Sequence, residues 1–218
     1  RNIFSNLSIT TIFILLNVVF FFIITGLFAF DLITIDSFAI KPSNIVSGNY
    51  LWTFITSMFM HGGFFHLFAN MFSLFFVGGL VEKILGKKRY IWFYLLSGLF
   101  ASLFFILLSL LFFPSEFNQY AVGASGALFG IVGLLVILTP NLPVFVMLIP
   151  IPIKMKYAGP GLLLLLWFIS IAPLVVGGEQ IPIGNTAHLG GLIAGLGYGV
   201  YLKKKFPRKT NQIKKMFS

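Results

Sequence analysis

Residues 187–202, AHLGGLIAGLGYGVYL, form a long apolar run in which small residues recur at every fourth position. These small residues are Ala187, Gly191, Gly195 and Gly199. Side chains four residues apart lie on one face of an α-helix, and stripes of small residues let membrane helices approach closely. The run therefore predicts a membrane helix packed tightly against a neighbour. An earlier run, residues 123–138, offers similar small positions at Gly126, Gly130 and Gly133.

The composition of the whole chain extends this prediction to several helices. The 218 residues are 58% hydrophobic and 9% charged, with a mean hydropathy of +1.00, whereas soluble domains carry about 25% charged residues. A spanning helix needs about 20 mostly apolar residues. We therefore expect an all-α fold, a polytopic bundle of six transmembrane helices in one membrane domain, residues 1–205, followed by a short basic tail, residues 206–218. The expected spans are residues 9–30, 66–85, 90–113, 123–138, 159–176 and 187–202.

Charge is distributed unevenly between the two sides of this predicted bundle. Six spans place both chain ends on one side, and 14 of the 15 Lys and Arg residues then lie there, while four of the five acids lie opposite. Because basic loops stay in the cytoplasm, both termini are predicted to be cytoplasmic. The net charge of +10 then indicates a basic face near anionic membrane lipid, and no nucleic-acid partner is expected. The absence of cysteine excludes disulfides and thiolate metal sites.

Polar residues gather at the outer ends of the even-numbered spans. His66 and Asn70, four residues apart, share one helix face at the start of the second span. Ser125 opens the fourth span between Gly123 and Gly126, and His188 opens the sixth. Since all three spans run inward from the same side, these residues are predicted to lie at similar depth. Ionisable residues at such positions are costly and usually functional.

The residue types predict acyl-transfer chemistry. A serine hydroxyl is a weak nucleophile until a base removes its proton, so His188 is the expected base for Ser125. The side chains of His66 and Asn70, and the N–H of Ser125, are candidate donors to an oxyanion. No acidic residue lies in a span at this depth, which favours a Ser–His dyad over a triad. Phe129, one turn after Ser125, is expected to stack on the His188 ring.

Three motifs in this order resemble the rhomboid family of intramembrane serine proteases, over about residues 52–201. The second-span motif is His61, His66 and Asn70, the nucleophile motif is Gly123, Ser125 and Gly126, and the last-span motif is Ala187, His188, Gly191 and Gly195. Each motif alone is weak, and together they are specific. The chain departs from the family at Phe129, where tyrosine is frequent, and at Trp52-Thr53, where Trp-Arg is frequent.

The resemblance implies that Ser125 is the nucleophile and that His188 is base and then acid. It implies an oxyanion hole of His66, Asn70 and the Ser125 N–H, with His61 as a structural helper. Substrates would be transmembrane segments of other proteins, cut near the outer or periplasmic surface of the cell's inner membrane. Residues 159–186 would act as gate and cap, with no metal or cofactor. The sequence does not indicate an oligomeric state.

The same residue types also suit other structures and functions. Asn70 is also suited to an interhelical hydrogen bond, and Ser125 to a helix cap. A transporter would place polar residues at several depths rather than in the outer half alone. A non-catalytic family member that only binds membrane helices usually lacks the serine or the histidine. A zinc protease is disfavoured because His61 and His66 are five residues apart with no glutamate between them, unlike the H-E-x-x-H motif.

Overall fold

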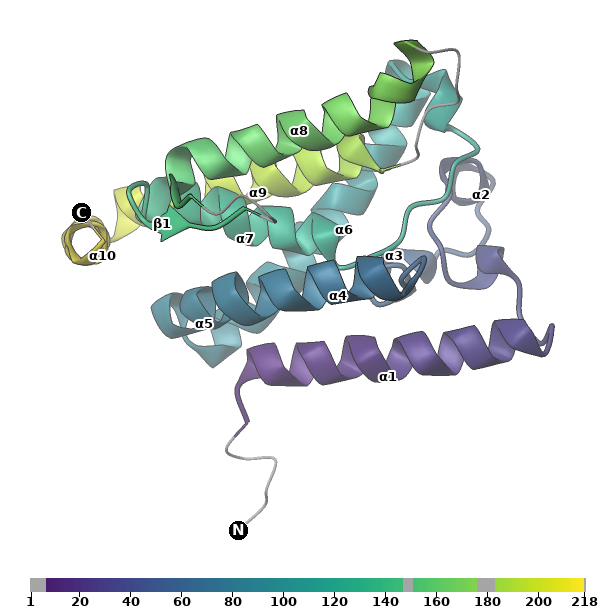
Figure 1. Ribbon diagram of the computed structural model, residues 1–218, viewed down its shortest axis with the longest axis horizontal. Helices are drawn as coiled ribbons and strands as arrows, with labels where there is room; N and C mark the ends of the chain where they lie inside the picture. The colour runs from purple at the N-terminus through teal and green to yellow at the C-terminus, as the bar shows by residue number, and fades with distance from the viewer. Residues whose placement is uncertain (1–6, 147–150, 176–182, 218) are drawn as a thin grey trace.

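The computed structural model describes residues 7–146, 151–175 and 183–217, with side chains placed for all of these except 174–175. Six helical segments run between the two ends of the molecule (Figure 1). They are α1 (Ile9–Ala29), the continuous segment α4 (Phe64–Ser73), η3 (Leu74–Gly78) and α5 (Gly79–Leu85), then α6 (Lys87–Leu111), α7 (Ser125–Leu138), α8 (Met155–Val175) and α9 (Asn185–Lys205). The predicted all-α membrane bundle is confirmed.

Among the described residues, four segments are both long and apolar enough to cross a membrane, namely Ile9–Ala29, Phe64–Leu85, Lys87–Leu111 and Met155–Pro173. The helix α7 is apolar but has 14 residues, and α9 has 21 residues that include its glycines and three terminal lysines. The order of all six agrees with the predicted spans. The start of α8 at Met155 rather than 159 corrects that boundary, because Pro160 lies inside the helix, as membrane helices tolerate.

The helix α7 occupies the centre of the bundle, with its most extensive contacts against α9 and further contacts with α6 and α8. Its interface with α9 is made by backbone. A Cβ added at Gly191 would overlap the carbonyl oxygen of Gly126, and one added at Gly195 would overlap that of Gly130. The small-residue stripe therefore packs as predicted, and it fixes the start of α7 beside the start of α9.

The helix α1 lies on the outside of the bundle along α4, η3 and α5 (Figure 1). Its first turn is held by Glu82 of α5, whose carboxylate accepts hydrogen bonds from the N–H groups of Ile9 and Thr10, both at 2.8 Å. The Thr10 hydroxyl donates a third bond at 2.7 Å. Such bonds satisfy N–H groups that every helix start leaves unpaired, and a carboxylate is favoured there by the helix dipole.

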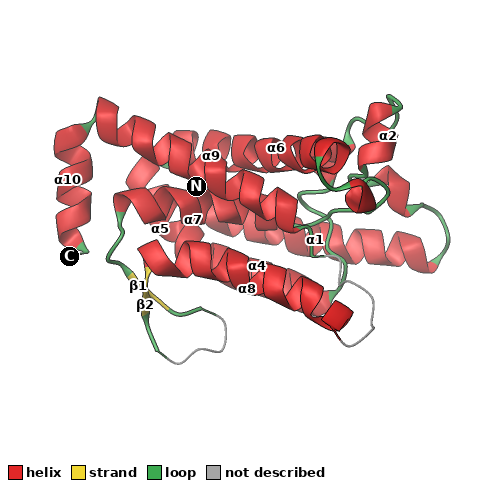
Figure 2. Cartoon of the chain, turned by 90° about the horizontal axis from the view of Figure 1, so that it is seen from above, coloured by secondary structure: helices red, strands yellow, loops and turns green. Residues whose placement is uncertain are grey.

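Several short elements were not predicted. The first long loop contains η2 (Ile35–Ser37), α2 (Pro42–Val46) and α3 (Thr53–Thr56), and the loop before α7 contains η4 (Pro114–Glu116). The strands β1 (Pro143–Val144) and β2 (Ile153–Lys154) pair antiparallel. The basic tail forms α10 (Pro207–Met216), which lies across the end of the bundle near β1 and β2 (Figure 2). Pro207 begins this helix, where its missing N–H costs nothing.

Candidate active site

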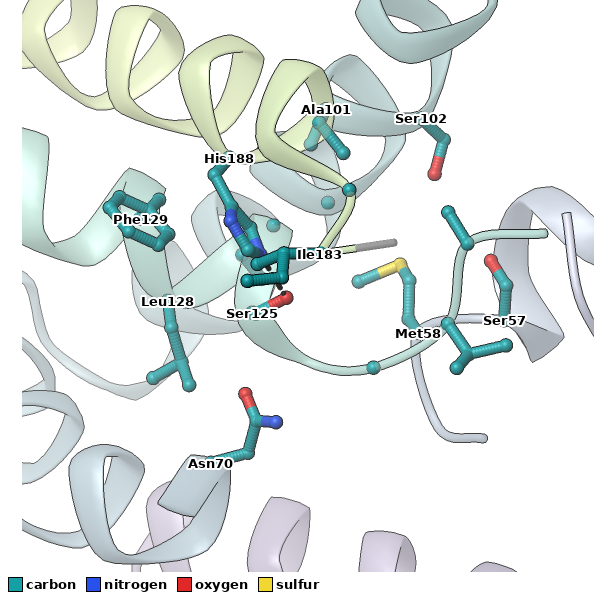
Figure 3. A pocket seen from close by; sticks show the side chains of 18 of the residues that line it. Ser57, Met58, Asn70, Ala101, Ser102, Ser125, Leu128, Phe129, Ile183 and His188 are labelled. Carbon is teal, nitrogen blue, oxygen red and sulfur yellow. Dashed lines mark hydrogen bonds between the residues drawn. The ribbon is translucent and has the colours of Figure 1, made fainter. Parts of the chain in front are cut away.

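The starts of α4, α7 and α9 meet at a cavity of about 620 Å³. His66 and Asn70 reach it from α4, Ser125 is the first residue of α7, and His188 lies in the first turn of α9. Figure 3 shows His188 above Ser125 and the Asn70 amide below it, so that the three side chains converge from three helices. The structure thus brings together residues up to 122 positions apart, from His66 to His188.

The closest polar contact in the cavity joins the Ser125 hydroxyl to the His188 ring. Ser125 Oγ and His188 Nε2 are 2.8 Å apart, which is hydrogen-bonding distance. When His188 carries its proton on Nδ1, the hydroxyl donates to Nε2, the geometry a general base needs. Within the described part of the chain, buried Nδ1 has no hydrogen-bond partner. Among these residues, the hydrogen bond therefore joins Ser125 and His188 without a third side chain on Nδ1.

Packing holds the His188 ring in place. The ring of Phe129 stacks on it with centroids 4.7 Å apart and planes 24° apart. Both side chains are buried, with 5% of Phe129 and 6% of His188 exposed. Offset stacking of this kind restrains a ring to one orientation. Phe129 thus restrains the His188 ring without the hydroxyl of the tyrosine that is frequent in the family.

Gly123 sets the distance between α4 and the backbone that leads into Ser125. It has a φ of +113° and its N–H donates to the Ser57 carbonyl at 2.8 Å. A Cβ here would lie 2.8 Å from His66 Nε2 and 3.7 Å from Asn70 Nδ2. Only glycine suits both the conformation and the space. The His66 and Asn70 nitrogens therefore lie against the backbone just before the nucleophile candidate.

His61 lies behind His66, in the loop before α4. The two rings contact edge to face, with centroids 5.1 Å apart, and His61 Nδ1 is 3.2 Å from the Phe59 carbonyl oxygen. Burial, with a smaller contribution from His66, lowers the pKa of His61 from 6.5 to about 4. His61 is therefore neutral at pH 7, and its ring contacts the ring of His66.

The low pKa of His61 predicts a loss of stability in acid. The unfolded chain binds a proton near pH 6.5, whereas the folded protein does so only near pH 4. The folded state is therefore penalised as the pH falls through this window, on the order of 3 kcal/mol at its lower end. Thermal unfolding of wild type and His61→Gln between pH 7.5 and 4.5 measures this. We expect the wild type to lose more stability than the variant, and parallel losses would contradict the assignment.

The cavity continues sideways between two helices. Its walls include Ala69, Ser73 and Val77 from α4 and η3, and Leu162 and Leu166 from α8. The π-helical turn η3, which begins one turn after Asn70, was not predicted, and such turns are frequent at functional sites. Of the expected gate and cap, residues 159–175 belong to α8, while residues 176–182 lie outside the described residues.

Loop residues that line or brace the cavity were missed by the sequence analysis. Ile40 and Ala121 form an isolated antiparallel bridge, and Asp36 accepts a hydrogen bond from the Tyr120 hydroxyl at 2.9 Å. Met58 packs against Gly98, where an added Cβ would lie 2.7 Å from its sulfur. These contacts join residues far apart in the chain without periodic spacing, so no pattern in the sequence indicated them.

Fold and site together define a class, a multi-pass α-helical membrane protein with a Ser–His pair where three helices begin at the same end of the bundle. Residues 48–205 match the family model described as Rhomboid domain. The chain belongs to the rhomboid family, which confirms the resemblance drawn from its three motifs.

Individual relatives give the same result. The chain is 36% identical over 174 residues to RHOMBOID-like protein 1 of Arabidopsis thaliana, covering 77% of this chain and 39% of that protein. It is 30% identical over 163 residues to Rhomboid protease GluP of Bacillus subtilis (strain 168), covering 74% and 28%. A match to Inactive RHOMBOID-like protein 8 of Arabidopsis thaliana, 35% identical over 89 residues, covers 41% and 23%. The chain spans about half or less of the length of these curated relatives.

Proposed function

We propose that this protein is an intramembrane serine endopeptidase that hydrolyses peptide bonds in or near transmembrane segments of other membrane proteins. The observation that carries the proposal is the 2.8 Å contact between Ser125 Oγ and His188 Nε2, in a chain that belongs to the rhomboid family. A relative whose name includes "protease" is consistent with it. Another whose name includes "Inactive" means that family membership alone does not decide activity.

In the proposed reaction, Ser125 Oγ attacks the carbonyl carbon of the scissile bond while His188 Nε2 takes the hydroxyl proton. The tetrahedral intermediate collapses, His188 gives that proton to the leaving amine, and an acyl-enzyme remains. A water molecule then repeats the cycle with His188 as base, which releases the carboxyl product and restores Ser125. Phe129 keeps the His188 ring aligned through both halves of the reaction.

The negative charge on the intermediate needs donors that are already in place. The Ser125 N–H lies in the first turn of α7, where N–H groups have no acceptor within the helix and the helix dipole favours an anion. His66 Nε2 and Asn70 Nδ2 both lie close to Gly123, two residues before Ser125. Together these three groups form the proposed oxyanion hole.

Removing either side-chain donor is expected to lower the turnover rate. His66→Ala and Asn70→Ala are each expected to lower kcat about 10²–10³-fold, the usual cost of one lost oxyanion donor. Ser73→Ala, on the same cavity wall, is the matched control and should retain the wild-type rate. Measured kcat values on one substrate, with unfolding temperatures alongside, check this. A folded His66→Ala, Asn70→Ala double variant with the wild-type kcat would remove both residues from the proposed oxyanion hole.

The orientation in the membrane is proposed from charge. The basic turn between α5 and α6, the β1–β2 hairpin and α10 lie at one end of the bundle (Figure 1), and the Ser–His pair lies towards the other. By the positive-inside rule the basic end faces the cytoplasm, together with both termini. The cavity then opens towards the outer or periplasmic side of the inner membrane. Substrate segments would enter sideways between α4 and α8.

The proposed activity is tested with purified protein in liposomes that contain a model single-span substrate. We expect two fragments from the wild type, with a cut near the outer end of the span by mass spectrometry. Ser125→Ala protein of equal stability should produce none. A wild type that binds but does not cut several such substrates would instead indicate a non-catalytic member of the family.

A further inference from the structure

A second contact, separate from the dyad itself, joins the segment that leads to Ser125 with the helix that carries His188. Glu116 ends η4, nine residues before Ser125, and its Oε2 accepts a hydrogen bond from the Thr186 hydroxyl at 2.6 Å. Thr186 is the second residue of α9 and is fully buried, with 0% of its surface exposed. It stands two residues before His188. The contact therefore reaches the same helical turn as the proposed base.

The first turn of α9 lacks a cap of its own. Its N-cap residue is Gly184, at a φ of +63°, and no side chain of that residue can accept from the free N–H groups. Helices that start on serine, threonine or aspartate gain stability from such a bond. The hydrogen bond from the Thr186 hydroxyl to Glu116 ties this turn to the loop before α7 instead. Burial raises the pKa of Glu116, as expected for a carboxyl group drawn out of water at this position.

The segment that presents Glu116 is itself anchored on its other side. The Ser43 N–H donates to the Phe117 carbonyl at 3.0 Å, and the Ile40 and Ala121 backbones exchange two hydrogen bonds of 3.1 and 2.9 Å. The loop between α1 and α4 thus holds residues 117–121 through backbone hydrogen bonds. Glu116, the residue before them, connects this part of the chain to α9. A shift of residues 116–121 would therefore move both Ser125 and His188.

We propose that Glu116 is a positioning residue, which acts through Thr186 to hold the first turn of α9 so that His188 Nε2 stays at the Ser125 hydroxyl. The inference rests on the proposed function for its effect on turnover, and on the geometry alone for its effect on α9. The glycine contacts between α7 and α9 lie deeper in the bundle and set the separation of the two helices. Glu116 and Thr186 fix the orientation of the turn above them.

The test compares Thr186→Val with Thr139→Val. The two threonines are equally buried, at 0% exposed, and Thr139 bonds to the Leu135 carbonyl at the far end of α7. We expect Thr186→Val and Glu116→Ala to lower kcat about 10- to 100-fold with little change in KM, as small misplacements of a catalytic group do. Thr186→Ser keeps the hydroxyl and Glu116→Gln keeps an acceptor, so both should restore most of the rate. Thr139→Val should leave kcat unchanged.

Amide hydrogen exchange on the same proteins measures the stability of the first turn of α9 and needs no substrate cleavage. We expect faster exchange in the first turn of α9 in Thr186→Val and Glu116→Ala, with exchange in α7 unchanged. Exchange and kcat that both match wild type would overturn the proposal, as would a rise in KM alone, which would make Glu116 a substrate contact. If the wild type cleaves nothing while exchange changes as expected, the proposed function fails and the positioning contact stands.

Discussion

Replacing Ser125 or His188 with alanine is expected to lower kcat by about 10⁴–10⁶-fold, and replacing both should lower it no further. The two side chains act as one unit through the 2.8 Å contact between Oγ and Nε2. Once either is lost, the other has no partner with which to form or break the acyl bond. Losses of two residues that act together are therefore far from additive.

The measurement is kcat for the two single variants and the double variant on one transmembrane substrate, with unfolding temperatures recorded for each. Ser102→Ala is the matched control, because Ser102 lines the same cavity and is not placed in the dyad. Its rate should equal that of the wild type. A double variant much slower than either single variant would show that the two residues contribute separately and would contradict a dyad.

Adding a side chain at Gly191 or Gly195 is expected to disrupt the bundle as well as the site. A Cβ at Gly195 would overlap the Gly130 carbonyl oxygen and lie 2.8 Å from the Leu134 nitrogen. Since backbone atoms cannot turn aside as a side chain can, α7 and α9 must separate. Overpacking typically lowers the free energy of unfolding by about 1–3 kcal/mol, occasionally more. We expect Gly195→Val to lower it by more than about 3 kcal/mol, because the overlap is with backbone atoms.

The same helix supplies the control for this prediction. Gly197 has nothing within 4 Å of an added Cβ, so Gly197→Ala should retain the wild-type unfolding temperature and kcat. Gly191→Ala and Gly195→Val should unfold at lower temperature, and any folded fraction should cleave slowly because Ser125 and His188 no longer meet. Equal unfolding temperatures for Gly195→Val and Gly197→Ala would contradict the backbone contact between the helices.

The helical core of the fold could be predicted from the sequence because the bilayer imposes simple rules on it. Long apolar runs must be helices, since every backbone group has to be satisfied within the span. The fourfold spacing of small residues in 187–202 then indicated which face of α9 packs, and the structure places that face on Gly126 and Gly130. The meeting of Ser125 and His188 followed from the direction of their spans.

The loops could not be predicted in the same way. Glu82 on the first turn of α1, Asp36 on Tyr120 and Glu116 on Thr186 make polar contacts between residues more than 65 positions apart. No periodicity encodes such a pair, and the order of the spans does not fix which loop residues meet. Gly123 was predictable in part. The sequence placed it in the nucleophile motif, but only the structure shows its positive φ and its close approach to His66.

Covalent labelling of the purified membrane protein with a serine-reactive fluorophosphonate, followed by peptide mapping, tests directly whether Ser125 is the nucleophile and His188 its base. Ser57, Ser73 and Ser102 line the same cavity as Ser125, so the position of the label discriminates between four hydroxyl groups. We expect one adduct per chain, located on Ser125, and its loss in His188→Ala protein that remains folded. A label on another cavity serine, or labelling of Ser125 that does not depend on His188, would show that Ser125 is not a nucleophile activated by His188.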